Sequence, residues 1–203
     1  MRQNKSVQYL ARLAMLMAIV IIFTVFNIAN IPVGPIVATV YQVPVIIGAC
    51  LLDLKAGALL GATWGVLNFI LAITGQTTDV VALAAIQQAP FQYFLVSFLP
   101  RLAVGIIAAL LDKALERFKG DWTYLVCGAC GSLVNTVGYL GLLYLLFKNM
   151  IATVYGMDIS GVLPMVLGVA GTNGSVEAVV SALLTLGICK AVDIIDHKRE
   201  NVN

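Results

Sequence analysis

Long apolar runs separated by short polar stretches dominate the pattern of hydrophobic and polar positions along the chain. About 20 consecutive apolar residues are enough for a helix to cross the hydrocarbon core of a bilayer. The second run is short for a span, but we count it with the others. The pattern therefore predicts an all-α integral membrane protein with six transmembrane helices and a single membrane domain over residues 1–203. The runs cover about residues 7–31, 37–52, 57–74, 89–111, 122–147 and 173–195.

Composition supports this class. The chain is 61% hydrophobic and 11% charged, with a mean hydropathy of +0.98, whereas a soluble domain carries about 25% charged residues. Too little polar sequence remains for a separate soluble domain. No basic patch is interleaved with aromatic residues, which disfavours nucleic-acid binding. The first run is longer than a signal-peptide core and no cleavage site follows it, so we expect it to stay in the mature protein.

The basic residues predict the orientation. With six spans and a cytoplasmic N-terminus, only Lys148 among the loop residues falls outside, and Arg101 falls within the membrane. Because loops rich in Lys and Arg stay in the cytoplasm, we predict that both termini are cytoplasmic and that the protein lies in the bacterial plasma membrane. The inner basic residues are Arg2, Lys5, Arg12, Lys55, Lys113, Arg117, Lys119, Lys190, Lys198 and Arg199.

The outer connections differ from the inner ones. They cover about residues 27–39, 75–90 and 148–172, are rich in glycine and proline and carry almost no charge. This pattern predicts a pocket that opens outward and is covered by loops. Within the third connection, residues 163–169 fit either a re-entrant piece or the start of the last helix, because hydropathy alone does not separate the two.

Arg101 is the one charge in the apolar run from 80 to 111. An arginine stays charged at any accessible pH, and at the centre of a bilayer it costs about 3 kcal/mol on insertion scales. We therefore expect a partner, either a ligand or a side chain. A helix that starts near Pro90 places Arg101 at mid-membrane, and one that starts near Pro100 places it close to the outer rim.

Few other polar residues fall within the predicted spans. Asn135 and Tyr139 share a helix face, as do Asn173 and Glu177, because residues four apart are neighbours on a helix. Such groups either line a substrate path or bond neighbouring helices; we favour the first for the set and the second for Asn68 alone. The candidate substrate-binding residues are Arg101, Asn135, Tyr139, Asn173, Glu177, Gln92, Tyr93 and Asn68.

Glu177 has two further interpretations. If the last helix begins near Asn173, the carboxylate lies close to its N-terminus, where the helix dipole favours a negative charge. Arg101 and Glu177 would then also be able to form an ion pair, as in a purely structural or scaffold membrane protein. That ion pair is the main alternative to ligand binding.

No motif predicts a catalytic site. The phosphate-binding pattern Gly-x-x-x-x-Gly-Lys-Ser/Thr does not occur, so any ATP hydrolysis would belong to another subunit, and we expect no enzyme activity. Cys127 and Cys130 have the spacing of a redox or metal motif, but no second pair and no nearby histidine accompany them. We therefore interpret them as small residues in a helix interface and predict no metal and no cofactor.

Several short motifs in this order resemble the substrate-binding S components of energy-coupling factor (ECF) vitamin transporters over nearly the whole chain. No single motif is diagnostic, and their combination carries the resemblance. They are Ala14-Met-Leu-Met-Ala18, Ile31-Pro-Val-Gly-Pro35, Val43-Pro-Val-Ile-Ile-Gly48, Lys55-Ala-Gly57 with Gly61, Pro100-Arg101 with Gly105, Asn135-Thr136, and Asn173-Gly174 with Glu177.

The resemblance implies six helices, a vitamin site near the outer face and a partner module of one transmembrane T component and two ATPases. It places Ala14 and Ala18 on the surface that docks against the T component, with an internal helix contact as the alternative. Its pantothenate-type branch fits best, with Arg101 binding the ligand carboxylate. Pyridoxine or hydroxymethylpyrimidine and riboflavin are the next candidates, and a stand-alone secondary carrier is a further alternative.

Overall fold

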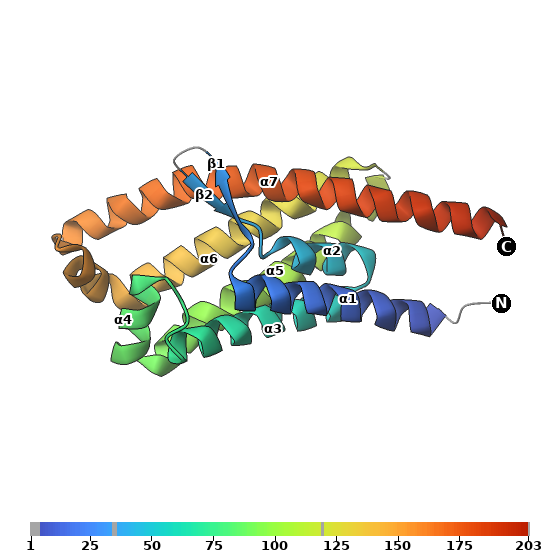
Figure 1. The fold of residues 1–203 in the computed structure, drawn as a ribbon. Coiled ribbons are helices and arrows are strands. Elements are labelled where there is room, and N and C mark those ends of the chain that lie inside the picture. The colour runs from blue at the N-terminus through green and yellow to red at the C-terminus, as the bar shows by residue number, and fades with distance from the viewer. Residues whose placement is uncertain (1–4, 34–35, 119, 203) are drawn as a thin grey trace.

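Seven α-helices and one short β-hairpin form an elongated bundle in a computed structural model, which describes residues 5–33, 36–118 and 120–202 (Figure 1). A single 3-10 turn, Glu116–Phe118, follows the fifth helix. The elements are α1 (Lys5–Phe26), β1 (Asn30–Val33), β2 (Ile36–Thr39), α2 (Val43–Leu51), α3 (Leu54–Ile73), α4 (Val80–Gln88), α5 (Pro90–Leu115), α6 (Trp122–Tyr155) and α7 (Ile159–Val202).

The described residues contain five helices that are long and apolar enough to cross a membrane, namely α1, α3, α5, α6 and α7. The apolar run predicted at 37–52 is instead divided between strand β2 and the nine-residue helix α2. Nine residues extend only about 13 Å along a helix axis, so α2 crosses less than half of a bilayer core of about 30 Å. The helical class agrees with the sequence, apart from the hairpin, and the count of six spans stays a prediction.

The last two helices are longer than their apolar runs. Helix α6 continues through Lys148 to Tyr155 and ends at Gly156, which has the left-handed φ of 62°. Helix α7 begins at Ile159 and runs on through Pro164. The third outer connection predicted at 148–172 is therefore mostly helix, and residues 163–169 belong to α7. Hydropathy missed this because glycines lower the apolar score of the segment, although membrane helices tolerate glycine and proline.

A row of glycines brings α3 and α5 into backbone contact. A Cβ added at Gly57 would lie 2.7 Å from the carbonyl oxygen of Gly105, and one at Gly65 would lie 2.9 Å from the Cα of Phe98. At Gly61 the added Cβ would collide with the carbonyl oxygen of Arg101. Small residues at four-residue spacing allow this close approach. We call this contact between α3 and α5, at Gly57, Gly61, Gly65 and Gly105, the glycine seam. It fixes the position of the Arg101 backbone against α3.

The hairpin is attached to the end of α1. Strands β1 and β2 pair antiparallel, with Asn30 opposite Thr39, and the amide of Val40 donates to the carbonyl oxygen of Ala29 over 2.9 Å. Asn27 ends the helix with a left-handed φ of 53°, a conformation that asparagine tolerates better than most residues. Its side-chain oxygen accepts a hydrogen bond from the hydroxyl of Tyr41. The hairpin thus folds back over the middle of the bundle.

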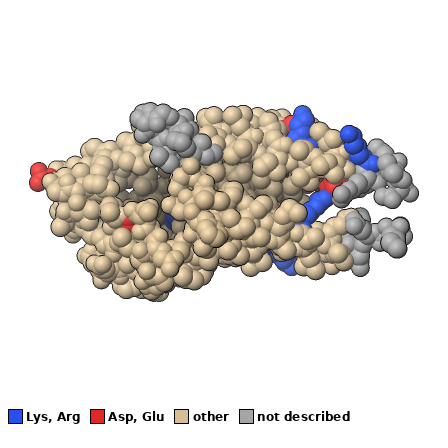
Figure 2. Space-filling model, viewed as in Figure 1, with Lys and Arg blue, Asp and Glu red and all other residues tan. Residues whose placement is uncertain are grey.

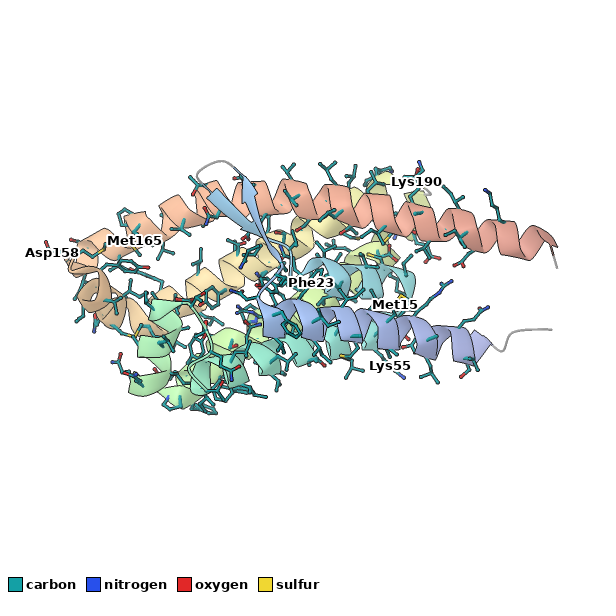
Figure 3. All side chains as sticks on the ribbon, viewed as in Figure 1. Met15, Phe23, Lys55, Asp158, Met165 and Lys190 are labelled. Carbon is teal, nitrogen blue, oxygen red and sulfur yellow. The ribbon has the colours of Figure 1, made fainter. Side chains whose placement is uncertain are left out.

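Both termini lie at the same end of the bundle (Figure 1). Lys55 and Lys190 lie toward that end, whereas Asp158 lies at the opposite end (Figure 3). On the face shown in Figure 2, most of the basic side chains gather toward the terminal end. The distribution agrees with the predicted positive-inside bias, and the assignment of the terminal end to the cytoplasm stays a prediction.

Candidate functional site

A cavity of about 430 Å³ lies in the half of the bundle away from the termini. In this half of the molecule the surface is visibly hollowed (Figure 2). The walls of the cavity come from the ends of α1 and α3, the hairpin, the loop before α4, and helices α5, α6 and α7. The polar and aromatic lining residues are Thr24, Asn27, Asn30, Thr39, Tyr41, Trp64, Asn68, Gln76, Thr77, Thr78, Asp79, Tyr93, Arg101, Asn135, Thr136, Tyr139, Asn173 and Glu177.

Arg101 is positioned by the proline that precedes it. In an α-helix the N–H of residue 100 would donate to the carbonyl of Val96, but Pro100 has no N–H. The Nη1 of Arg101 donates to that same carbonyl oxygen over 3.0 Å. Because α5 begins at Pro90 without a break at Pro100, Arg101 lies about 17 Å along the helix axis. The structure therefore selects the mid-helix position over the rim position.

The Arg101 guanidinium is buried, with 8% of the residue exposed, and aromatic rings replace a counter-ion beside it. Its central carbon lies 4.4 Å from the ring centroid of Tyr139 and 5.3 Å from that of Trp64. Cation–π contacts of this kind attract the charge to the ring face. Its Nε makes no hydrogen bond with the described residues. Only one of the five N–H donors of an arginine has an identified partner, so most of its hydrogen-bonding capacity remains for a ligand.

Glu177 does not pair with Arg101. Its Oε1 accepts hydrogen bonds from the amide of Thr39 over 3.1 Å and from the hydroxyl of Thr39 over 2.7 Å, and its Oε2 accepts from Thr136 over 3.3 Å. The ion-pair alternative is therefore wrong. The interpretation through a helix dipole is wrong as well, because α7 begins at Ile159 and the dipole acts within the first turn. Glu177 instead ties strand β2 to α6 and α7.

Asp79 brings the loop before α4 into the site. Its Oδ1 caps α4 by accepting from the amides of Val81 and Ala82, over 2.9 and 3.2 Å. Its Oδ2 accepts from the hydroxyl of Tyr139 over 3.0 Å. Since the ring of Tyr139 also faces Arg101, this tyrosine links an acid of the lining to the only cation among the described residues that line the cavity.

Asn135 carries a second polar atom without a partner. The side chain is buried, and its Oδ1 makes no hydrogen bond with the described residues. Leaving a buried polar atom unpaired costs about 1–3 kcal/mol. Such atoms in a cavity wall are well placed for a polar ligand.

Seven of the eight candidate binding residues line this one cavity, and their binding role remains a prediction. The exception is Gln92, which is exposed and lies outside the lining set. Asn68 donates to the carbonyl of Trp64 in its own helix over 2.9 Å and also lines the cavity. Sequence reasoning missed Thr39, Trp64 and Asp79. The signal for Asp79 was its place in the polar stretch 76–79; Trp64 and Thr39 lie in apolar segments that gave no such signal.

Ala14 and Ala18 are both exposed on α1. The opposite face of this helix supplies Leu13, Leu16 and Val20 to the core. The two alanines therefore lie on a surface that a partner helix is able to reach, and their docking role stays a prediction.

Comparisons with known proteins place the chain among transport proteins. The family described as "ECF transporter, substrate-specific component" matches residues 8–189. The pantothenic acid transporter PanT of Lactococcus lactis is 28% identical over 166 residues, covering 78% of this chain and 79% of its own. The pantothenate transporter PanT of Leuconostoc mesenteroides is 27% identical over 194 residues, covering 91% and 92%.

The family match spans most of the chain, and the two relatives align with it over most of their lengths. Five apolar helices long enough to cross a membrane fit a transport protein of the bacterial cell membrane. This multi-pass membrane protein therefore belongs to the family of ECF transporter substrate-specific components.

Proposed function

We propose that this protein is the pantothenate-binding subunit of an ECF-type vitamin transporter. The observation that carries the proposal is Arg101, a buried cation in a cavity wall with no carboxylate partner among the described residues. A ligand carboxylate would supply the missing charge through short, charge-assisted hydrogen bonds. Both relatives named above are pantothenate transporters.

The rest of the lining suits a ligand with hydroxyl groups. Pantothenate has a carboxylate at one end, hydroxyls at the other and an amide between them. The carboxylates of Asp79 and Glu177 accept hydrogen bonds from hydroxyl donors, and the free Oδ1 of Asn135 suits an amide N–H. The cavity of about 430 Å³ is within the usual range of about 300–1,000 Å³ for small-molecule sites.

Binding to the purified protein tests the substrate. We expect pantothenate to bind in detergent without ATP, and more tightly than pyridoxine, hydroxymethylpyrimidine or riboflavin, in isothermal titration calorimetry. Tighter binding of riboflavin would favour the aromatic lining of Tyr41 and Trp64 over Arg101 as the main determinant. Absence of binding across the panel would contradict the proposal.

Substitution of Arg101 tests the carrying observation. Losing one partner of a buried charge pair costs about 2–5 kcal/mol, so Arg101→Ala should weaken pantothenate binding at least about 30-fold. Gln92→Ala, on the same helix but outside the cavity, is the matched control and should bind normally. The alcohol analogue of pantothenate, which lacks the carboxylate, should bind weakly to the parent protein. Its affinity for Arg101→Ala should be about the same as its affinity for the parent protein. An unchanged preference for the acid in that variant would contradict the assignment.

We propose further that transport requires a T component and two ATPases, with Ala14 and Ala18 in the docking surface. Vesicles that contain this protein alone should bind pantothenate without accumulating it, and ATP-dependent uptake should appear when the partner module is added. Uptake by the protein alone would favour a stand-alone carrier. Ala14→Leu with Ala18→Leu should abolish uptake and leave pantothenate affinity unchanged.

A further inference from the structure

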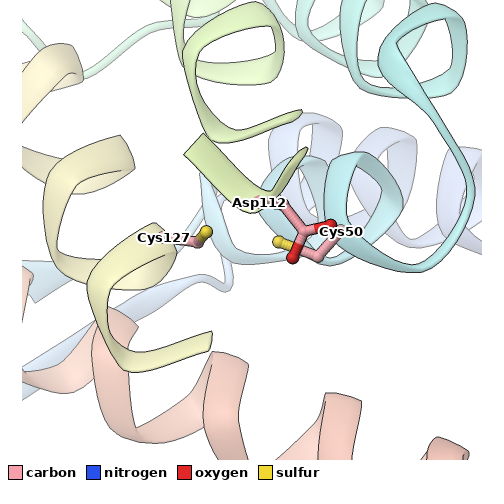
Figure 4. Close-up of side chains that lie close together, drawn as sticks. All are labelled: Cys50, Asp112 and Cys127. Carbon is pink, nitrogen blue, oxygen red and sulfur yellow. The ribbon is translucent and has the colours of Figure 1, made fainter. Parts of the chain in front are cut away.

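A second cluster of reactive side chains lies on the terminal half of the bundle, away from the cavity. The ligand atoms of Cys50, Asp112 and Cys127 all lie within 4.8 Å of one another. They come from three elements, the end of α2, the end of α5 and the first turns of α6. In Figure 4 the two sulfur atoms and the carboxylate point toward one another in the space between these helices.

Among the described residues, Asp112 has no partner that would explain its position. Its carboxylate forms no hydrogen bond and no ion pair among the described residues, although the side chain is half-buried. Buried carboxylates are normally hydrogen-bonded, paired with a cation or bound to a metal. Asp112 faces two thiols instead: that of Cys127 has a weak acceptor in the carbonyl of Ala108 at 3.7 Å, and that of Cys50 lies in hydrogen-bonding contact with Cys127.

An acidic pocket leads to the cluster. It is lined by Asp112, Glu116, Asp121, Thr123, Tyr124 and Asp193, and thus by four carboxylates. Lys190 pairs with Asp121 at its rim, and the hydroxyl of Tyr124 donates to Asp193 over 2.7 Å. Glu116 and Asp193 keep their negative charge uncompensated by an ion pair among the described residues. A path of this sign attracts cations toward Asp112.

We propose that Cys50, Asp112 and Cys127 bind a soft or borderline divalent cation, with zinc as the best fit. Two thiolates and one carboxylate form a tetrahedral ligand set when water from the acidic pocket occupies the fourth position. Zinc–sulfur bonds of about 2.3 Å place the two sulfurs about 3.8 Å apart in such a site. The ligand atoms lie within 4.8 Å of one another, so the two sulfurs are at most about 1 Å farther apart than in such a site.

Binding has a defined proton balance. Each thiol loses its proton to solvent on coordination, and the carboxylate is already ionised, so one Zn²⁺ displaces two protons. The bound ion would join α2, α5 and α6 at the terminal end. The two-residue spacing of Cys127 and Cys130 does not indicate this site, because Cys130 lies outside the cluster and the three ligands come from separate segments.

Metal titration of the purified full-length protein tests the proposal. In metal-free buffer with a phosphine reductant, Cd²⁺ should give thiolate-to-metal charge-transfer absorption that saturates at one equivalent. Zn²⁺ should compete for the same site, release two protons and raise the unfolding temperature. Cys50→Ser and Cys127→Ser should lose the absorption and the thermal shift, and Asp112→Asn should bind at least tenfold more weakly.

Cys130→Ser is the matched control, because this thiol lies one helical turn from Cys127 and outside the cluster, and it should behave like the parent protein. Pantothenate titration of each variant shows whether the distant cavity, and hence the fold, is intact. Folded parent protein that gives no charge-transfer band overturns the proposal. So does a band that survives in Cys50→Ser and Cys127→Ser.

Discussion

The two halves of the bundle differ in how their basic side chains are partnered. At the terminal end Arg12 meets Asp196 with Nη2–oxygen distances of 2.5 and 2.7 Å, and Lys190 meets Asp121, with all four side chains partly exposed. In the cavity half Arg101 is buried and has aromatic rings and one carbonyl as neighbours. Exposed ion pairs contribute about 0–1 kcal/mol, so the terminal pairs tolerate loss, whereas a buried cation without a counter-ion is poised for an anion.

The same contrast holds for the acids. Glu177 and Asp79 accept several hydrogen bonds each and hold the two covering segments, the hairpin and the loop before α4. Asp112 at the other end holds nothing identified and faces two thiols. Acids with partners organise the cavity, and the acid without one belongs to the proposed metal site. Four further substitutions test this difference between the two halves, together with Arg101→Ala described above.

The largest effect on the fold should come from Gly61→Ala. A Cβ there collides with the backbone carbonyl of Arg101, and overpacking of this kind costs about 1–3 kcal/mol. The unfolding temperature and the pantothenate affinity should both fall, because the seam holds Arg101 in place. Gly187→Ala on the exposed face of α7, where an added Cβ meets nothing within 4 Å, should leave both unchanged or raise stability slightly. Equal behaviour of the two variants would contradict the role of the seam.

Glu177→Gln should have the next largest effect. The amide keeps the shape of the side chain but loses the charge, and hydrogen bonds to charged groups are about twice as strong as neutral ones. We expect pantothenate affinity to fall about tenfold, corresponding to about 1.4 kcal/mol. Hydrogen exchange at the amide of Thr39, which donates to this carboxylate, should accelerate. Exchange that stays at the parent rate would show that Glu177 does not hold the hairpin.

Tyr139→Phe should have a smaller effect. The ring remains over Arg101, but the hydroxyl that donates to Asp79 is removed. Hydrogen bonds to charged groups contribute about 1.5–3 kcal/mol, and binding should lose only part of this because Asp79 keeps its two bonds from the amides of α4. We expect about a fivefold loss of pantothenate affinity, with the preference for the acid over its alcohol analogue retained. Loss of that preference would assign the hydroxyl, rather than the guanidinium, to carboxylate recognition.

Arg12→Ala should have the smallest effect. The pair with Asp196 is about one-third exposed on both sides, so its removal should lower stability by at most about 1 kcal/mol. Pantothenate affinity should not change, since the pair lies outside the cavity. A loss of affinity comparable to that of Arg101→Ala would show that the two halves are coupled and that the terminal ion pair contributes to binding in the cavity.

The sequence by itself determined the membrane class, the five long apolar helices and seven of the residues that line the cavity. Apolar length and intramembrane polar groups are local signals, and each survives in the folded chain. Arg101, Asn135 and Asn173 were found in this way because a polar group in an apolar run is conspicuous wherever its helix packs.

Only the tertiary structure decided which groups meet. Val37 to Leu52 became a strand and a short helix, and Glu177 turned from a presumed helix-end acid into a partner of Thr39. Trp64 reached Arg101 across the seam, and Cys50, Asp112 and Cys127 converged from separate segments. These contacts depend on how helices distant in sequence pack against one another, and the periodicity of one segment carries no information about its neighbour in space.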